Sequence, residues 1–244
     1  MLTKGIDPRT YGIKDSLQGV KRIIAVGSGK GGVGKSTVSS FLSLVLDDSG
    51  FKVGLLDLDL FGPSTHLILN ARKMEPDENY GLRPVEINRM KFMSIVYFTE
   101  NRPFAMRGKA VTDAALELLT ITKWGNLDFL IIDTPPGLGD ITLDILGFLR
   151  QSEFLLVSSP ALISWETVSK LLGLLKEEKA NILGLVENMK TSTHSFLEEE
   201  CRKEKIRYLG GIRFLPGIEA LYGDFIALRK SDISKDLRNI ISLI

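Results

Sequence analysis

Short apolar runs alternate along the chain with segments in which apolar residues recur every three or four positions. The runs are typical of strands buried on both faces, and they lie at 22–26, 53–56, 127–132, 154–157, 182–186 and 212–215. The recurring patterns predict amphipathic helices at 38–46, 111–119 and 168–175, with Gly50 ending the first. Buried strands joined by helices predict an α/β fold of three layers, a mostly parallel sheet flanked by helices.

Two segments depart from this alternation. Residues 1–20 precede the first core strand and are expected to form an N-terminal extension. The segment 70–90, NARKMEPDENYGLRPVEINRM, is polar and contains two prolines. We expect it to be an excursion from the sheet or a hairpin at its edge.

Directly after the first strand comes the stretch Gly29–Thr37, GKGGVGKST, which satisfies the phosphate-loop pattern G-x-x-x-x-G-K-[ST]. The motif requires a buried strand before it and an amphipathic helix after it, and both are present here. The alternative, a flexible turn capped by Ser36, would need neither. Lys35 is expected to reach the β- and γ-phosphates, and the Ser36 hydroxyl to ligate Mg²⁺. Residues 21–244 are therefore predicted to be a single P-loop domain that binds a nucleotide. The candidate nucleotide-binding residues of the loop are Gly29, Lys30, Gly31, Gly32, Val33, Gly34, Lys35, Ser36 and Thr37.

Aspartates end two of the predicted strands, at the edge where an open parallel sheet gathers its ligands. Asp133 follows the apolar run 129–132, which suits the Walker-B position that holds Mg²⁺ through a water molecule. Asp57 and Asp59 end the preceding strand two residues apart, so they are expected to point to one side of the pleat. The stiff turn 134–137, TPPG, could sense the γ-phosphate. A single such aspartate is more often a helix cap or a turn former, but three at one edge predict metal and water handling.

Composition narrows the class of protein without changing the fold. The chain has 244 residues, with 31 Lys and Arg against 30 Asp and Glu, so no broad charged surface for nucleic acid or anionic lipid is expected. The longest apolar runs are too short to span a bilayer, and the first residues, MLTKGIDPRTYG, lack the apolar core of a secretory signal. Cys201 is the single cysteine, so no intrachain disulfide can form, and a cytoplasmic location is expected.

The phosphate loop carries a second lysine, Lys30, directly after its first glycine. In this it resembles the deviant Walker-A ATPases, which include the ParA and MinD partition proteins, nitrogenase iron protein and the Mrp-type iron–sulfur carrier ATPases. The resemblance implies a dimer, most simply a homodimer, in which Lys30 crosses the interface and touches the partner subunit's phosphates, as an arginine finger does. The plainer alternative is a solvated surface lysine, but a charge in the middle of a phosphate cradle is hard to regard as idle.

Three further stretches resemble the Mrp-type branch: LDLDLFGPS at 56–64, IDTPPGLGD at 132–140 and VENM at 186–189. The likeness covers about residues 20–190. It implies that Asp59 positions the attacking water, that Asn188 contacts the adenine edge and that Pro216 lies beside the base. It also implies ATP and ADP as the nucleotides and a slow Mg²⁺-dependent hydrolysis that is gated by dimer assembly. The candidate catalytic residues are Lys30 and Asp59.

The cargo site of that branch is missing from this sequence. Mrp-type carriers place a C-x-x-C pair a few residues beyond VENM, and two subunits share one cluster through the four thiolates; here 189–201 reads MKTSTHSFLEEEC. Cys201 comes too late for either position, falls on an expected helix and is interpreted as structural. His66 and His194 have no metal-ligand spacing with another candidate and are interpreted in the same way. An iron–sulfur cluster held by this chain's own cysteine is possible but not expected.

Three explanations of the missing pair stay open. The chain could form a heterodimer with a cysteine-bearing relative, it could be a nucleotide switch for another client, or it could hold cargo through residues of another kind. The predicted function is an ATP-hydrolysing dimeric switch of the Mrp type with a role in iron–sulfur cluster assembly or transfer to apo client proteins.

The alternative function is a positioning ATPase of the MinD/ParA type, which acts on membrane or nucleoid. Its sequence support is an apolar stripe near the C-terminus, formed by Ile233, Leu237, Ile240, Ile241 and Ile244. A basic amphipathic tail can lie on a membrane, but Lys235 and Arg238 are matched by Asp232 and Asp236, which favours a helix that closes the sheet. Electron transfer of the nitrogenase-iron-protein kind needs two cluster cysteines per subunit and is excluded by the cysteine count.

Overall fold

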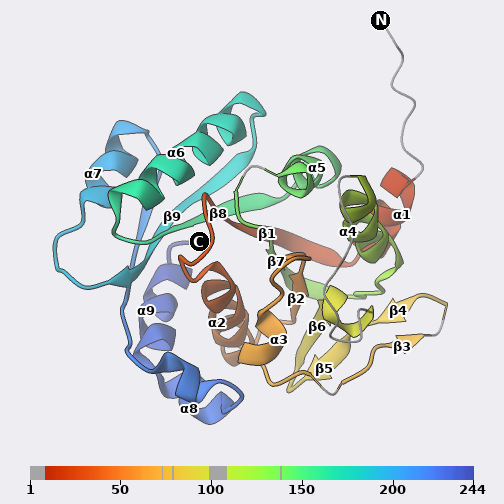
Figure 1. Cartoon of the computed structure of the whole chain (residues 1–244). Coiled ribbons are helices and arrows are strands. Elements are labelled where there is room, and N and C mark those ends of the chain that lie inside the picture. The colour runs from red at the N-terminus through yellow and green to blue at the C-terminus, as the bar shows by residue number, and fades with distance from the viewer. Residues whose placement is uncertain (1–8, 73, 79, 99–108, 138) are drawn as a thin grey trace, which may run out of the picture.

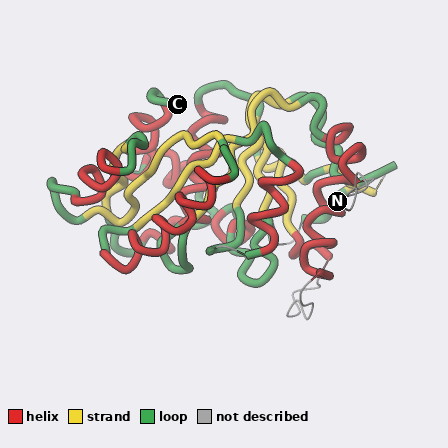
Figure 2. Tube along the Cα trace, turned by 90° about the horizontal axis from the view of Figure 1, so that it is seen from above, coloured by secondary structure: helices red, strands yellow, loops and turns green. Residues whose placement is uncertain are grey.

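The computed structural model describes residues 9–72, 74–78, 80–98, 109–137 and 139–244. Its centre is an eight-stranded sheet that is parallel except at one edge, where the last strand pairs antiparallel with its neighbour. Helices cover both faces, as Figures 1 and 2 show, so the predicted three-layer α/β fold is confirmed. In order across the sheet, the strands are β10 (Tyr208–Arg213), β9 (Asn181–Lys190), β8 (Glu153–Ser158), β1 (Val20–Ser28), β7 (Leu127–Asp133), β2 (Val53–Asp57), β6 (Met90–Ser94) and β5 (Val85–Ile87).

One face of the sheet is covered by the helix that follows the phosphate loop and by the C-terminal helices. Ile233, Leu237 and Ile240 of the last helix are buried in this core, so most of the C-terminal apolar stripe closes the sheet. Because its apolar side is covered by this chain itself, the stripe no longer supports a membrane-lying tail. The helices on this face are α2 (Lys35–Asp48), α3 (Thr65–Ile68), α8 (Phe225–Lys230) and α9 (Asp232–Ile241).

The opposite face carries the remaining helices and a separate apolar core. The first helix belongs to this packing: Ile13 and Leu17 are buried, and Ser16 Oγ donates a hydrogen bond of 2.7 Å to the Leu119 carbonyl. The division of the chain at residue 20 stays a prediction, although residues 9–17 pack on the core. The helices on this face are α1 (Arg9–Ser16), α4 (Lys109–Ile121), α5 (Asp140–Phe148), α6 (Leu162–Glu177) and α7 (Phe196–Lys203).

The predicted strands match the observed ones except at the last, which was placed too late. β10 covers Tyr208–Arg213 instead of 212–215, and Phe214 is 52% exposed beyond its end. Glycines at 210 and 211 interrupt the apolar pattern there, so the sequence signal was weak. The polar segment 70–90 forms the antiparallel hairpin of β3 (Asp77–Glu78) and β4 (Leu82–Arg83) and then the edge strand β5, as expected.

The strand order places the chemistry-bearing residues at one edge of the sheet. β1 lies between β7 and β8, so the loop that follows it emerges at the centre of the carboxyl edge. β2 pairs with β7 in a register that sets Asp57 directly beside Asp133, and β1 sets Val26 beside the same residue. Two short 3₁₀ helices, η1 (Ile95–Phe98) and η2 (Ile218–Leu221), complete the elements. None of the described helices is long and apolar enough to cross a membrane.

Candidate functional site

The loop between β1 and α2 is clamped at both ends and open in its middle. A Cβ on Gly29 would lie 2.2 Å from the backbone carbon of Thr167 on α6, and one on Gly34 would lie 2.2 Å from Asn188 Nδ2. Gly34 also has a φ of 78°, which favours glycine. An added Cβ on Gly31 or Gly32 would meet no atom within 4 Å. A phosphate could therefore approach the backbone N–H groups in the middle of the loop.

Asp133, at the end of β7, contacts three side chains at the start of α2. Its buried carboxylate lies 2.7 Å from the Lys35 ammonium and accepts hydrogen bonds from Ser36 Oγ at 2.6 Å and Ser39 Oγ at 2.7 Å. A buried charge needs such partners. Ser39 was not anticipated, although it lies one helical turn after Ser36 and so shares its face.

The same residues suit a magnesium ion. Ser36 supplies a hydroxyl and Asp133 a carboxylate, which are hard oxygen donors of the type that Mg²⁺ prefers. The two groups face each other at 2.6 Å beside the open part of the loop. The donor chemistry therefore fits the ion, and the direct hydrogen bond is the contact that a metal or its water would replace.

Asp57 and Asp59 have different environments. They were expected to point to one side of a strand, but β2 ends at Asp57, so Asp59 lies beyond the strand. The Asp57 carboxylate is buried and accepts hydrogen bonds from the Thr65 hydroxyl at 2.5 Å and from the Asp59 N–H at 3.0 Å. Burial, and then the nearby Asp133 charge, raise the pKa of Asp57 to about 7. Asp57 therefore anchors the start of α3.

Asp59 lies in the turn beyond β2 and is half-buried. Its Oδ1 accepts a hydrogen bond of 3.1 Å from the Gly62 N–H, and burial raises the pKa of its carboxyl group. Together with Pro136 it forms one side of an open pocket of about 230 Å³, and loop residues 30–37 form the other side. Lys30 lines this pocket, and its ammonium has no ion pair with any residue that the structure describes.

The two predicted base contacts, Asn188 and Pro216, lie outside the lining of this pocket. Asn188 is buried at the end of β9, and its Nδ2 donates a hydrogen bond of 2.9 Å to the Val33 carbonyl in the loop. Pro216 is exposed in the turn after β10. Sequence reasoning missed Tyr222, whose hydroxyl lies 3.5 Å from Thr37 Oγ1. The contacts of Asn188 and Pro216 with adenine stay predictions.

The segment 189–201, where the Mrp-type branch would place its cysteine pair, contains one cysteine, and that cysteine is buried. Cys201 is buried on α7, and burial, followed by the charges of Glu198, Glu200 and Glu187, raises the pKa of its thiol to about 12. Since the thiolate is the metal ligand, such a thiol is a poor one. Within the described ranges, no three His, Cys, Asp or Glu side chains are grouped so as to hold a metal ion. These residues do not fit an iron–sulfur cluster.

The parallel sheet, the clamped loop with Lys35 and Ser36, and the strand-end Asp133 define the class of this protein: it is a P-loop NTPase. The family model described as NUBPL iron-transfer P-loop NTPase matches residues 19–211. The chain belongs to this family.

Relatives carry names of the same kind. An iron–sulfur cluster carrier protein of Aquifex aeolicus is 40% identical over 180 residues, which are 72% of this chain and 50% of the relative. A cytosolic Fe-S cluster assembly factor, Nubp2 homolog 2 of Drosophila yakuba, is 42% identical over 182 residues, 71% of this chain and 70% of the relative. The chain spans between 50% and 59% of the length of the first bacterial relatives it matches.

Solved structures with the same fold include nucleotide complexes. A nucleotide-binding protein from Archaeoglobus fulgidus in complex with ADP aligns with a TM-score of 0.77 at 30% identity, covering 94% of this chain and 95% of that one. The cell division ATPase MinD of Pyrococcus furiosus aligns with a TM-score of 0.67 at 25% identity, covering 91% and 98%. The expected resemblance to the Mrp-type branch of the MinD/ParA superfamily is thereby confirmed.

Proposed function

We propose that this chain is an ATP-binding and ATP-hydrolysing switch that works as a dimer in iron–sulfur cluster assembly or transfer. The observation that carries the proposal is the convergence of Lys30, Lys35 and Asp59 on one open pocket at the carboxyl edge of the sheet. The names of the relatives, a cluster carrier and a cluster assembly factor, supply the cellular process. The proposed location is the cytoplasm.

Each residue of the pocket has a proposed role. Lys35 exchanges its ion pair with Asp133 for the β- and γ-phosphates, and Ser36 and Asp133 hold Mg²⁺, Asp133 through a water molecule. The bound ion neutralises charge on the phosphates. Asp59 positions the attacking water: Gly62 fixes its carboxylate, and its raised pKa makes it a better proton acceptor.

Lys30 is proposed to act in trans. It lines the pocket without an ion pair among the described residues, so no internal partner holds it when a second subunit approaches. A cation delivered by the partner subunit would complete the charge neutralisation only in the dimer, which makes hydrolysis depend on assembly and keeps it slow.

Adenine recognition is proposed for Asn188, with Pro216 beside the base. The Asn188 amide nitrogen is occupied by the Val33 carbonyl, while its carbonyl oxygen has no hydrogen bond recorded in the described part of the chain. An acceptor in this position would bind the exocyclic amine of adenine and repel the O6 oxygen of guanine.

Cargo is proposed to be held by the partner protein. The raised pKa of Cys201 and its burial argue against a ligand role in this chain. In a homodimer the cluster would be held by the apo client protein, and in a heterodimer it would be held by the cysteine-bearing relative. The heterodimer explains how a cluster is held without a thiolate from this subunit.

Mixing two inactive variants tests the trans role. Lys30→Ala binds ATP but lacks the cation for its neighbour, and Lys35→Ala binds no ATP but still offers Lys30. We expect each variant alone to hydrolyse ATP at least about 10³-fold more slowly than the unchanged protein, since fingers of this kind contribute about 10³–10⁵ in rate. The mixture is expected to regain activity that neither component has.

The controls separate the possible failures. ADP affinity of Lys30→Ala, measured by calorimetry, is expected to be unchanged. Full activity of this variant alone would rule out a catalytic Lys30. Loss of activity without recovery on mixing, while co-purification of an untagged variant with a tagged one shows mixed dimers, would assign Lys30 to its own subunit's nucleotide.

A further inference from the structure

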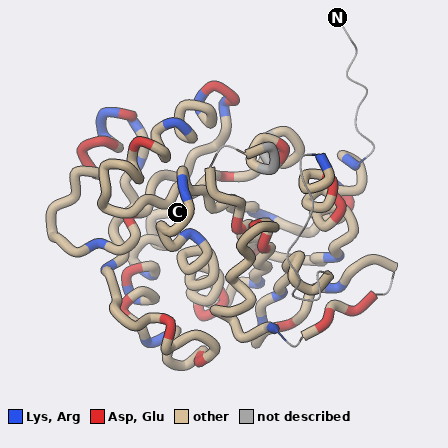
Figure 3. Tube along the Cα trace, in the orientation of Figure 1, with Lys and Arg blue, Asp and Glu red and all other residues tan. Residues whose placement is uncertain are grey.

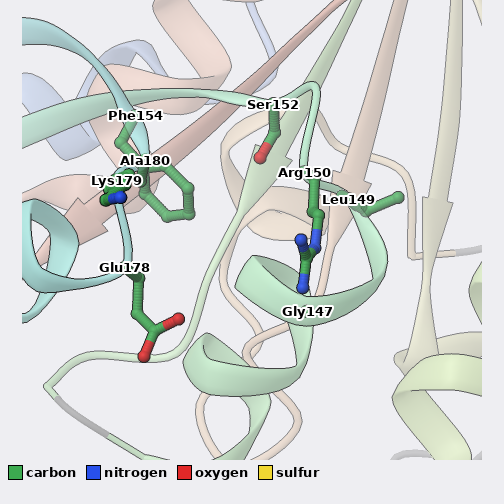
Figure 4. A pocket seen from close by; sticks show the side chains of 8 residues that line it. All are labelled: Gly147, Leu149, Arg150, Ser152, Phe154, Glu178, Lys179 and Ala180. Carbon is green, nitrogen blue, oxygen red and sulfur yellow. The ribbon is translucent and has the colours of Figure 1, made fainter.

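A second pocket lies at the opposite edge of the sheet from the phosphate loop. Its volume is about 260 Å³. The turn between α5 and β8 forms one wall with Arg150 and Ser152, and the turn between α6 and β9 forms the other with Glu178 and Lys179 (Figure 4). The Phe154 side chain, at the start of β8, lies between the two walls. Nothing in the proposed ATPase function uses these residues.

Ser152 is the first sign that this pocket is a binding site. The residue is 1% exposed, and its hydroxyl has no hydrogen-bond partner among the residues that the structure describes. Leaving a buried hydroxyl unpaired costs free energy, so such groups generally have a partner. Figure 4 shows the hydroxyl pointing into the space between Phe154 and Arg150. A ligand in the pocket could therefore supply the missing hydrogen bond.

The charges around the pocket point to the sign of that ligand. Arg150 and Lys179 contribute two positive charges and Glu178 one negative charge, and none of the three has an ion pair within the part of the chain that the structure describes. The Leu149 carbonyl just after α5 and the Leu175 carbonyl near the end of α6 could oppose an anion, but the N–H groups of Ser152 and Ala180 already bond to them at 2.8 and 2.9 Å. The side chains therefore dominate, and their net charge is positive.

We propose that this pocket binds a small organic anion and regulates the nucleotide site. Its carboxylate or phosphate group is held by Arg150 and Lys179 and accepts a hydrogen bond from the Ser152 hydroxyl, while its carbon skeleton lies against Phe154. Arginine suits such groups because its planar guanidinium offers paired donors. The volume lies slightly below the range of about 300–1,000 Å³ typical of drug-sized ligands, which fits a small metabolite.

The two walls of the pocket connect it to the phosphate loop. α5 begins after the turn in which the Gly137 N–H donates to the Ser28 carbonyl at 2.8 Å, directly before the loop. α6 packs its backbone at Thr167 against Gly29 so closely that a Cβ would not fit. Both helices therefore contact the phosphate-loop region at one side and end at the pocket on the other. An anion that holds their far ends together would shift their near ends, and this regulatory part rests on the proposed ATPase function.

Calorimetric titration of the full chain with citrate and with inorganic phosphate, in excess ADP, tests the site. ADP occupies the phosphate loop, so that the anion cannot bind there. We expect saturable binding that weakens at least about tenfold in Arg150→Ala and in Ser152→Ala, because each removes a hydrogen bond to a charged group. Lys170→Ala, an exposed change of equal charge on α6 outside the pocket, should bind as the unchanged protein does. Binding of citrate alone or of phosphate alone identifies the acid group.

The outcomes separate the site from its regulatory role. Absence of saturable binding, or equal binding in all three variants, overturns the proposal. If the site binds, ADP affinity is expected to change at least about fivefold on adding the anion, and Arg150→Ala is expected to lose this change, which separates it from competition at the phosphate loop. Binding without such a change, or a change that persists in Arg150→Ala, rejects the regulatory part alone. A chain that binds anion but no ADP would contradict the proposed ATPase function and leave the pocket assignment intact.

Discussion

The carboxyl edge of the sheet contains two neighbouring regions that treat charge differently. Around the phosphate loop, Lys30 and Asp59 line an open pocket. At the end of β9, by contrast, the Glu187 carboxylate is buried and accepts a hydrogen bond of 2.6 Å from the Tyr208 hydroxyl, with the Lys190 ammonium 3.7 Å away. Burial, and next this hydrogen bond, raise the pKa of Tyr208. The first region offers its charges to a ligand, whereas the second satisfies them within the chain.

This difference indicates that nucleotide chemistry and cargo chemistry are separable in this fold. The phosphate loop depends on β1, β2 and β7 in the middle of the sheet, whereas a cluster site in the Mrp-type branch would follow β9. Losing thiolates after β9 leaves the register that places Asp57 beside Asp133 unchanged. Figure 3 shows both signs of charge interspersed along the rest of the chain.

Lys35→Ala should have the largest effect on the nucleotide region. We expect ADP affinity to fall more than about 100-fold, because several charge-assisted hydrogen bonds to phosphate are lost together. Calorimetry measures the affinity, with Lys170→Ala as the control of equal charge. The Asp133 carboxylate also loses a partner, so thermal unfolding must show that the variant is folded. Unchanged affinity in a folded variant would contradict the loop assignment.

Asp59→Ala is expected to slow hydrolysis about 100-fold or more while ATP binding persists, since a general base typically contributes about 10²–10⁴ in rate. With ATP and Mg²⁺ the variant should accumulate as a dimer, which light scattering coupled to gel filtration detects. Asp59→Asn, which keeps an acceptor for the Gly62 N–H, is the matched variant. Finding only monomers under these conditions would count against a nucleotide-driven dimer.

The reactivity of the Cys201 thiol tests the region that follows β9. We expect it to react with an aromatic disulfide reagent at least about 100-fold more slowly in the folded chain than after denaturation, since burial removes both access and thiolate. Anaerobic reconstitution with iron and sulfide should leave the homomeric protein colourless. A coloured, iron-containing chain would show that it holds cargo through residues of another kind.

The same thiol gives a pH dependence with a defined sign. The pKa of an unfolded cysteine is about 8.5, whereas burial raises the pKa of Cys201 to about 12, so the folded state binds more protons between these values. Stability should therefore fall as the pH rises through that window. Comparison with Cys201→Ala by chemical denaturation isolates this contribution, because the variant lacks the group. If the free energy of unfolding falls equally with pH in the unchanged protein and in Cys201→Ala, another group causes the decrease.

Asn188→Ala should have the smallest effect and addresses the border between the two regions. We expect the preference for ADP over GDP to fall about tenfold, because the variant loses both the hydrogen bond to the exocyclic amine of adenine and the repulsion of the guanine O6 oxygen. The lost contact with Val33 weakens both nucleotides alike, so the ratio of the two affinities isolates the contact with the base. An equal decrease for both would mean that Asn188 only supports the loop.

Several features of the nucleotide region could be predicted from local pattern. The run at 22–26, the glycine-rich loop and the periodic segment 38–46 together indicated β1, the loop and α2, because strand and helix periods are properties of neighbouring residues. The residue Asp133 was identified from the apolar run before it. β10 was misplaced because glycines removed the same kind of signal.

Other contacts depended on segments far apart in the chain. Ser39 bonds to Asp133 and Asn188 bonds to Val33, although no spacing in the sequence relates these pairs. Likewise, the pocket that contains Ser152 exists because the ends of α5 and α6 meet beside β8.

By itself, the sequence determined most of the core strands and the amphipathic helices between them, which loop can wrap a phosphate, and that one cysteine cannot replace a cysteine pair. The tertiary structure decided which charges remain available to a ligand. The physical reason is that strand order and register set the burial and the partners of each side chain, and these in turn set its charge and reactivity. Lys30 and Asp59 remained open to a pocket, whereas Asp57, Glu187 and Cys201 became part of the interior.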